Sequence, residues 1–595
     1  MVSVFVAEQR PAPTGVGPAP TWRADIQGLR AVAVLMVVLF HARLPVPGGF
    51  TGVDVFFVIS GYVITRMLLD SIAQSGGLDL RGFYLARLRR LLPALLFMLT
   101  TTVIAVGIWA PDTIKRLLVD TPFALTGTIN WWLVANEQDY FESIGRPPLL
   151  QHTWSLAVEA QFYLIWPLIL YFILKKFGKK HIPVAALSIA AASGIALLLV
   201  SVSIDAANAS KVSHVYFGTD THSIGLFLGA ALAVSWIPQN FRVEISRKGQ
   251  NFIDGIGVIG FIGILATFLF IDASNPAMYK IAFPLAGIFG AAIIASIVHP
   301  ASRFAPVLQN KVLLWIGERS YAIYLWHWVI FQVTRPTVDL AGQAWALYSL
   351  RILIVFALAD ISLRYIELPL RRGVIQYWIK GRKYRTKKER NRQTSLLSAA
   401  TVIVVVIAAI VSVRAISIAS DARAALEKSL TVDTSNVIPA EKDGLWVTGD
   451  SVILGIRSVL EENHPISLVN ARIGRQAPEL LEVLIQDQPQ ALDSPIIFNL
   501  GNNNALSREQ VEQIFEAVKG QPQIIVVNTA VPRPWRDGNN QIIREVAANY
   551  PQADVIDWNE LSNGRPEYFA PDGVHLVPAG VNAYVGAILE KLQTK

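Results

Sequence analysis

The stretch GLRAVAVLMVVLFH, residues 28–41, is an apolar run that carries an arginine near its start and a histidine at its end. Arg30 and His41 are 11 positions apart. In an ideal α-helix that is three turns plus about 20°, so both side chains fall on one face, roughly 16 Å apart along the axis. Ionisable groups inside membrane helices are costly and indicate a functional site. The stretch therefore predicts a helical membrane protein with a polar path through the bilayer.

The composition agrees with this interpretation. Of 595 residues, 53% are hydrophobic and only 16% are charged, which is typical of a polytopic membrane protein with room for a soluble domain. The chain has no cysteine, which excludes disulfides, thiolate metal sites and cysteine nucleophiles. The net charge of +8 is explained by basic loops between apolar segments, so we expect no nucleic-acid partner.

Loop charge sets the number of membrane spans. With the N-terminus in the cytoplasm and residues 117–135 not crossing, the basic loops at 81–90, 175–180, 242–250 and 371–392 all fall inside. Residues 117–135 then form a re-entrant or outer-surface helix. The prediction is eleven spans of suitable length, near residues 29–45, 50–69, 91–110, 152–174, 182–203, 219–237, 252–271, 279–298, 311–333, 345–366 and 395–417.

The same topology divides the chain. Residues 1–22 are rich in Pro, Gly and Ala and lack the features of a signal peptide, so we expect a disordered cytoplasmic N-terminus. A membrane domain follows over 23–375, then a basic cytoplasmic loop over 376–394 and the eleventh span over 395–417. An odd number of spans places the linker 418–443 and everything after it outside.

Residues 444–595 change pattern and predict a separate α/β domain with a parallel sheet. Roughly 150 residues suffice for one independent core. The expected strands are 445–448, 466–470, 495–500, 523–528 and 553–556, and the expected helices are 451–462, 476–487, 507–519, 539–549 and 578–593.

This outer domain carries a hydrolase-like set of residues. Ser451 follows a strand and opens a helix, where the amides of the helix start can stabilise an oxyanion. Asp572 and His575 are three residues apart, so a carboxylate can orient an imidazole that deprotonates a serine. Gly474 and Asn503, each just after a strand, can add a backbone N–H and a side-chain amide. Each motif alone is equally typical of a turn; the four in this order favour a site.

The stretches GDSVILG, RIGRQ, VNTAVPRPW and DGVHL resemble the SGNH family of serine esterases and acetyltransferases, and most of all the outer domain of peptidoglycan O-acetyltransferases. The resemblance implies a three-layer α/β fold. It makes Ser451 the nucleophile, His575 the base, Asp572 its orienting partner, and Gly474 and Asn503 the oxyanion donors. The stretch GNNN departs from the usual pattern and leaves open which of its asparagines is the donor.

The membrane region resembles the acyltransferase family 3 domain across about 23–375. The matching stretches are DIQGLRAVAVLMVVLFH, GGFTGVDVFFVISGYVIT, FYLARLRRLLP, HTWSLAVEAQFYLIWP, GERSYAIYLWHW and RYIELPLRR. His222 stands where relatives often have arginine. The family moves acyl groups, commonly from cytoplasmic acyl-CoA, to carbohydrates across the membrane.

Roles for the membrane residues follow from this. Arg87 and Arg90, one turn apart at the inner end of a span, can clasp the phosphates of coenzyme A. Their alternative is a positive-inside anchor. His41 can act as a base on a hydroxyl, and Arg30 can steer the coenzyme arm; their alternative is a pair of buried, satisfied polar groups. Helical spacing predicts a second set as pore-lining, with packing as the alternative: His152, Glu159, Tyr324 and His327.

The sequence thus predicts a multi-pass bacterial inner-membrane O-acetyltransferase without a metal. Acetyl from cytoplasmic acetyl-CoA would reach Ser451 and then a hydroxyl of an envelope glycan or glycolipid. Peptidoglycan, surface polysaccharide, lipopolysaccharide and trehalose mycolate glycolipid all stay open as acceptors, as does the oligomeric state. Two alternatives remain: direct acylation by the membrane domain, with the outer domain an esterase or acceptor-binding module, and a glycolipid transporter.

Overall fold

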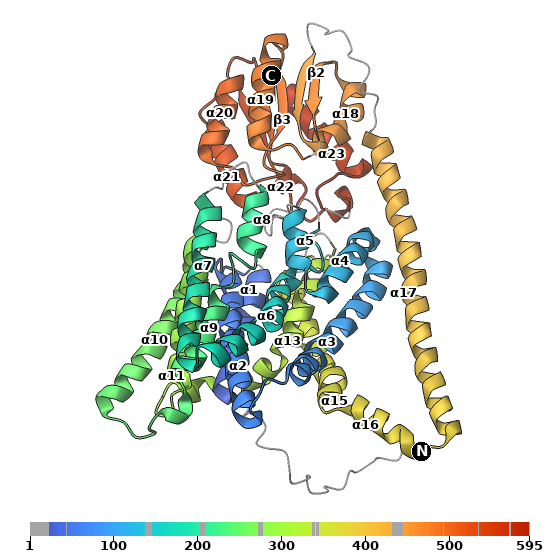
Figure 1. The fold of residues 1–595 in the computed structure, drawn as a ribbon. Helices are drawn as coiled ribbons and strands as arrows, with labels where there is room; N and C mark the ends of the chain where they lie inside the picture. Colours follow the sequence, from blue (N-terminus) through green and yellow to red (C-terminus); the bar gives the residue numbers. More distant parts are fainter. Residues whose placement is uncertain are drawn as a thin grey trace.

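The structure, a computed structural model, places a helical bundle beneath a small α/β domain, with one long helix beside the bundle (Figure 1). Sequence-distant helices surround α1 (Ala24–His41) at the centre of the bundle. The structure describes residues 23–42, 44–136, 146–202, 209–271, 278–335, 339–340, 344–430, 444–472, 474–491, 493–533, 535–570 and 573–593.

Nine helical segments of these residues are long and apolar enough to cross a bilayer. They contain α1, α2 (Gly52–Ser75), α3 (Leu80–Trp109), α6 (Trp154–Lys176), α7 (Ile182–Val202), α10 (Arg247–Phe270), α11 (Tyr279–Ile297), α14 (Ala344–Ile361) and α17 (Lys387–Leu430). Shorter helices connect them: α4 (Ile114–Thr126), α5 (Ile129–Ala135), α8 (Ala209–Phe217), α12 (Ala305–Leu308), α15 (Leu368–Arg371) and α16 (Val374–Gly381).

The other two expected spans, 219–237 and 311–333, correspond to helices that are too short or too polar to belong to these nine. Helix α9 (Ile224–Ser235) has only 12 residues, and α13 (Lys311–Val333) has 23 residues but carries Glu318 and Arg319. The segment 117–135 is divided at Gly127, whose φ of 70° ends α4 before α5 begins. Neither piece is long enough to span a bilayer.

Close helix packing fixes α2 against α9. A Cβ at Gly61 would lie 1.8 Å from the backbone oxygen of Leu226, and one at Gly229 would lie 2.1 Å from that of Val58. Only glycine permits backbones to approach this closely. The contact explains how so short a helix as α9 is held within the bundle.

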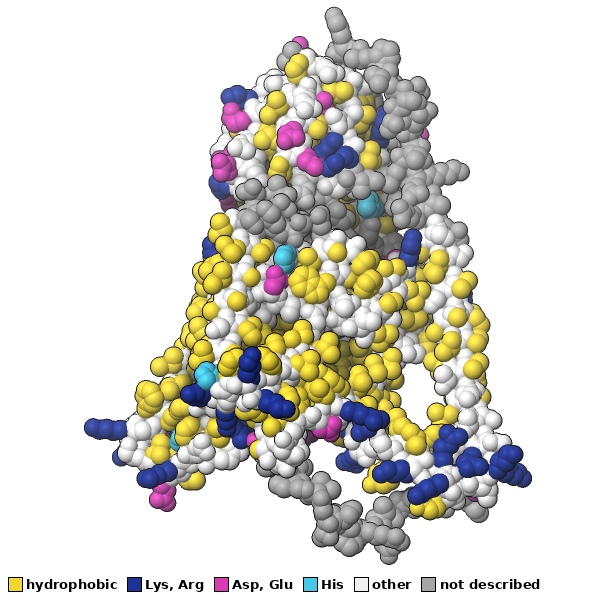
Figure 2. Space-filling view, in the orientation of Figure 1, with side chains coloured by type: hydrophobic (Ala, Val, Ile, Leu, Met, Phe, Trp, Pro, Cys, Tyr) yellow, Lys and Arg dark blue, Asp and Glu magenta, His cyan; other side chains and the backbone are white. Residues whose placement is uncertain are grey.

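The surface of the bundle is apolar in its middle and basic at the end remote from the α/β domain (Figure 2). We call this end the basic end. It includes the turn after α6, with Lys175 and Lys176 in the last turn of that helix, and the segment from α16 to the start of α17. The distribution matches the basic loops that the sequence groups on one side.

Helix α17 is longer than the predicted eleventh span. Its 44 residues include part of the expected loop 376–394 and part of the expected linker 418–443. No Gly or Pro interrupts residues 387–430, and Ala, the strongest helix former, is the commonest residue there, so the helix continues. A helix of this length reaches about 66 Å, roughly twice the thickness of a bilayer core.

The α/β domain has a five-stranded parallel sheet in the order β2-β1-β3-β4-β5, so the predicted parallel sheet is confirmed. Its strands are β1 (Leu445–Gly449), β2 (Ile466–Ala471), β3 (Ile496–Asn499), β4 (Ile524–Val527) and β5 (Ala553–Ile556). Its helices are α18 (Ser451–Asn463), α19 (Ala477–Asp487), α20 (Arg508–Val518), α21 (Arg536–Ala547), α22 (Trp558–Leu561) and α23 (Pro578–Gln593).

Two apolar cores flank this sheet. Ile496 and Phe498 of β3 pack in a core with α19, α20 and α21, whereas Ile497 packs in the other with α18 and α23. Alternate residues of a strand point to opposite faces, which explains the division. Both cores consist of residues from this domain alone, so residues 444–593 contain what they need to fold.

Candidate functional site

The loops at the carboxyl ends of the strands bring a serine and a histidine together. Ser451 is the first residue of α18, directly after β1, and His575 lies just before α23. The Nε2 atom of His575 is 2.9 Å from the Oγ atom of Ser451, within hydrogen-bond reach of a nucleophile and its base. Ser451 is 4% exposed. Asp572, the predicted orienting partner, lies outside the described residues.

Asp450 organises the loops around this pair. Its buried carboxylate accepts hydrogen bonds from Val452 N (2.9 Å) and from the Nδ2 atoms of Asn499 (2.6 Å), Asn502 (2.9 Å) and Asn503 (3.1 Å). Burial raises the pKa of the Asp450 carboxyl, and the hydrogen bonds oppose that rise. Sequence reasoning missed this role, although an aspartate just before a helix is a common N-cap and was a usable signal.

Gly449 allows the approach of β1 to β3. A Cβ there would lie 2.0 Å from Oδ1 of Asn499, and the φ of Gly449 is 152°. The same Asn499 oxygen accepts a hydrogen bond from Asp450 N at 3.0 Å. The glycine therefore lets Asn499 hold both the backbone and the side chain of Asp450.

The two predicted oxyanion residues lie on adjacent loops. Gly474, after β2, has a φ of 74°, a left-handed conformation that glycine favours. The Nδ2 atom of Asn503 donates to Asp450 and to Arg475 O, 3.0 Å away. Arg475 in turn donates to Asn470 O at 2.6 Å and to Asn470 Oδ1 at 2.7 Å. These contacts connect the loops after β1, β2 and β3.

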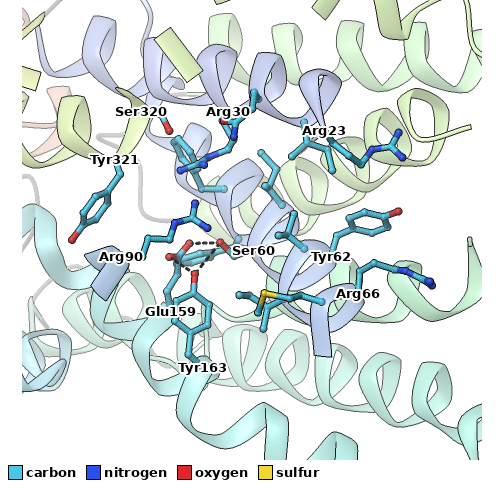
Figure 3. A pocket seen from close by; sticks show the side chains of 18 of the residues that line it. Arg23, Arg30, Ser60, Tyr62, Arg66, Arg90, Glu159, Tyr163, Ser320 and Tyr321 are labelled. Carbon is cyan, nitrogen blue, oxygen red and sulfur yellow. Dashed lines mark hydrogen bonds between the residues drawn. The ribbon is translucent and has the colours of Figure 1, made fainter. Parts of the chain in front are cut away.

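The bundle encloses a second candidate site, a cavity of about 330 Å³ (Figure 3). This volume falls in the range of small-molecule pockets. The predicted residues that line it are Arg30, Arg87, Arg90, Glu159 and Tyr324; lining residues that sequence reasoning missed include Arg23, Ser60, Tyr62, Arg66, Tyr163 and Tyr321.

A carboxylate and several cations share this cavity. Glu159 accepts hydrogen bonds from Ser60 Oγ at 2.6 Å and from the Tyr163 hydroxyl at 2.9 Å. Figure 3 shows Arg30 and Arg90 extending toward Glu159 from two different helices. Tyr163 lies four residues after Glu159, so helical spacing was a signal for it, whereas Ser60 comes from α2 and gave none.

Some polar atoms of the cavity are buried without a hydrogen-bond partner among the described residues. They include Arg87 Nε, Arg66 Nη1 and Ser320 Oγ, all from residues that line the cavity. Buried polar groups in proteins are normally satisfied. A ligand with anionic and polar groups would satisfy these atoms.

Three histidines lie behind Tyr324, and none of them is among the cavity-lining residues. His41 Nδ1 is 2.9 Å from His327 Nε2, and the rings of His152 and His327 are 5.8 Å apart. The Tyr324 hydroxyl donates to His152 O at 2.6 Å. The structure therefore brings the predicted histidines together, with Tyr324 between them and the cavity.

His222 pairs with a buried acid. Its Nε2 atom is 3.2 Å from Asp54 Oδ1, and both side chains are 2% exposed. The ring stacks on Phe283 with a centroid distance of 3.6 Å. Across the described ranges, no group of three or more His, Asp or Glu side chains is placed to hold a metal ion.

Comparison with known proteins places the chain among acyl-group enzymes. Residues 23–364 match the family described as an acyltransferase domain. The chain is 32% identical to the peptidoglycan O-acetyltransferase OatA of Listeria monocytogenes, over 96% of this chain and 98% of that protein. It is 31% identical to the O-acetyltransferase OatA of Staphylococcus aureus, over 97% of each. A solved structure of the C-terminal catalytic domain of Streptococcus pneumoniae OatA covers 26% of this chain and 93% of its own, at 24% identity and a TM-score of 0.24.

Proposed function

The chain belongs to the acyltransferase-domain family and is a multi-pass membrane O-acetyltransferase, and from this premise we propose that it acetylates hydroxyls of a cell-wall glycan. Peptidoglycan is the proposed acceptor, because a relative that matches over nearly the whole chain is a peptidoglycan O-acetyltransferase. The single observation that carries a covalent route is the 2.9 Å contact between His575 Nε2 and Ser451 Oγ.

The proposed donor is acetyl-CoA, bound in the cavity of the bundle. Arg87 and Arg90 supply guanidinium groups for the phosphates, and Arg30, which also lines the cavity, contacts the pantetheine arm. The unpartnered Nε atom of Arg87 supports this role. The basic end of the bundle is then cytoplasmic and the α/β domain lies outside the inner membrane, in accord with the positive-inside rule.

The α/β domain would transfer acetyl by an acyl-enzyme route. His575 Nε2 removes the proton of Ser451 while Oγ attacks the carbonyl of the acetyl ester that the membrane domain delivers. The bond from the acetyl carbon to the delivering oxygen breaks, and His575 gives its proton to that oxygen. The N–H groups of Ser451 and Gly474 stabilise the oxyanion, and Asp572 orients His575. Asn503 donates to the oxyanion once one of its two present hydrogen bonds, to Asp450 or to Arg475 O, is released. His575 then takes the proton of a glycan hydroxyl, which attacks the acetyl-serine and releases Ser451. In this proposal the domain is of the SGNH type.

The membrane domain would deliver the acetyl group. His41, the last residue of α1, acts as the base for the hydroxyl that attacks the thioester. Glu159 and Tyr324 line the route from the cavity. The pair His152 and His327 lies beside the route rather than on the cavity wall.

The test follows label from acetyl-CoA in full-length protein reconstituted with a peptidoglycan glycan fragment. Radioactive acetyl is expected on the wild-type protein and on the glycan, and on neither with Ser451→Ala. Ser458→Ala, on the same helix and partly exposed, is the matched control and should behave as wild type. Glycan labelling by Ser451→Ala at the wild-type rate would refute the acyl-enzyme route and favour direct acylation by the membrane domain.

A further inference from the structure

The hydrogen bonds of His327 determine which of its ring nitrogens carries hydrogen. Its Nδ1 atom is 2.7 Å from Tyr324 O and 3.2 Å from Ile323 O. Backbone carbonyls only accept hydrogen bonds, so Nδ1 of His327 must carry a hydrogen. His327 is fully buried and contacts no carboxylate in the part of the chain that the structure describes. Burial of an unpaired cation is costly, so the ring is neutral and its Nε2 atom holds a lone pair.

That lone pair sets the state of His41. The Nδ1 atom of His41 is 2.9 Å from Nε2 of His327. Because Nε2 of His327 accepts, Nδ1 of His41 must donate, and the lone pair of a neutral His41 is then on its own Nε2 atom. The opposite tautomers would point the unprotonated Nδ1 of His327 at two carbonyl oxygens. Among the described residues, the contacts of His327 therefore favour this arrangement of the His41–His327 pair.

We propose that His327 is a positioning residue that fixes the tautomer of His41, so that the Nε2 atom of His41 is the base of the membrane step. The inference rests on the role proposed for His41. In that step Nε2 takes the proton of the hydroxyl that carries acetyl on to Ser451, while the oxygen of that hydroxyl bonds to the acetyl carbon. The carbon–sulfur bond of acetyl-CoA breaks, and the proton passes from His41 to the sulfur of the departing coenzyme A.

The residues around His41 and His327 indicate that His327 orients the His41 ring and does not merely fill space beside it. The two imidazole rings lie 5.0 Å apart, and Trp328 packs edge-on against His41 at 4.8 Å. His41 therefore keeps its ring plane while its Nδ1–H is held. As His41 gains a proton it keeps this hydrogen bond, so the acceptor on His327 also stabilises the imidazolium.

The test compares isosteres at position 327 in full-length protein in proteoliposomes. Glutamine places its amide where Nε2 of histidine lies and can accept from His41; asparagine reaches only the Nδ1 position; leucine can do neither. Release of coenzyme A from acetyl-CoA is followed with a thiol reagent in the presence of a peptidoglycan glycan fragment. The chain has no cysteine, so the reagent reports coenzyme A alone.

We expect His327→Leu and His327→Asn to lower kcat by about 10²-fold or more, the scale of a general-base contribution. The KM for acetyl-CoA should change less than about threefold, since His327 does not line the cavity. His327→Gln should recover at least tenfold of the lost kcat. A role in packing alone would give no such difference between the two amides, because both change the shape of the site.

The outcomes separate the inference from the proposal on which it rests. A His327→Gln rate no higher than that of His327→Asn, or a wild-type kcat for His327→Leu, would overturn the inference while a low His41→Ala rate left the role of His41 intact. A wild-type rate for His41→Ala would overturn the role of His41 itself. A double variant His41→Ala/His327→Leu no slower than His41→Ala alone would support the coupling, and a further loss of the same size as in the single variant would contradict it.

Discussion

Replacing the Asp450 carboxylate by an amide should destabilise the α/β domain without changing its shape. In Asp450→Asn one oxygen can still accept from Val452 N and Asn499 Nδ2. The new NH₂ group would then face the Nδ2 atoms of Asn502 and Asn503, which donate to Oδ2 at 2.9 and 3.1 Å in the native site. Asn503 cannot simply rotate its amide, because its Nδ2 atom also donates to Arg475 O.

The magnitude follows from these two lost hydrogen bonds. A buried donor left without its partner costs about 1–3 kcal/mol. Two such donors, less the energy regained by no longer burying a charge, predict a fall of about 2–5 kcal/mol in the free energy of unfolding. Burial raises the pKa of Asp450 because a buried carboxylate charge costs free energy. The neutral amide of the variant removes that cost, which offsets part of the loss.

Urea denaturation of the fragment 444–595 at neutral pH measures the effect, since the two cores of the domain are complete within it. Asp537→Asn is the control. The Asp537 side chain is 77% exposed and, in the part of the domain that the structure describes, pairs with Arg536 at the surface, so the unfolding free energy should change by less than about 1 kcal/mol. A loss below about 1 kcal/mol in Asp450→Asn would show that the carboxylate does not hold the three loops together.

Three further outcomes are expected. The fragment 444–595 should hydrolyse p-nitrophenyl acetate, and Ser451→Ala should abolish this without changing the urea midpoint; equal turnover by both would remove Ser451 from the chemistry. Cysteines introduced at the exposed positions Lys383 and Glu509 should differ in intact cells, with an impermeant maleimide labelling only Glu509→Cys; the reverse pattern would invert the topology. Gly61→Ala should lower the unfolding free energy of detergent-solubilised protein by about 1–3 kcal/mol, because its Cβ would lie 1.8 Å from a carbonyl of α9, whereas Gly77→Ala, with open space around it, should be neutral in a thermal scan.

The elements of the α/β domain were predictable because each depends on local pattern. The predicted strand 553–556 and the observed β5 have the same bounds, and the other strands differ by one or two residues. Short apolar strands between amphipathic helices allow few other folds. The number of membrane spans was harder to predict than the α/β domain. Helices α9 and α13 belong to the bundle, but length and hydropathy alone do not identify them as spans.

The contacts between elements were beyond local pattern. Nothing near Glu159 in the sequence indicates that Ser60, 99 positions away, donates a hydrogen bond to it. The length of α17 shows a different limit of sequence reasoning. Hydropathy predicts only the apolar part of a helix, whereas residues that favour helix continue beyond it, so α17 extends past its apolar residues at both ends.

The two sites of the chain share one physical arrangement. In each, an imidazole contacts a side chain that is distant in sequence: His575 and Ser451 are 124 positions apart, and His41 and His327 are 286 apart. Family resemblance named His41 and His575, because a motif records which residue types occur. It did not show what His327 does for His41, because that depends on which nitrogen faces which acceptor. Tautomers are fixed by backbone carbonyls such as Tyr324 O, which no side-chain motif contains.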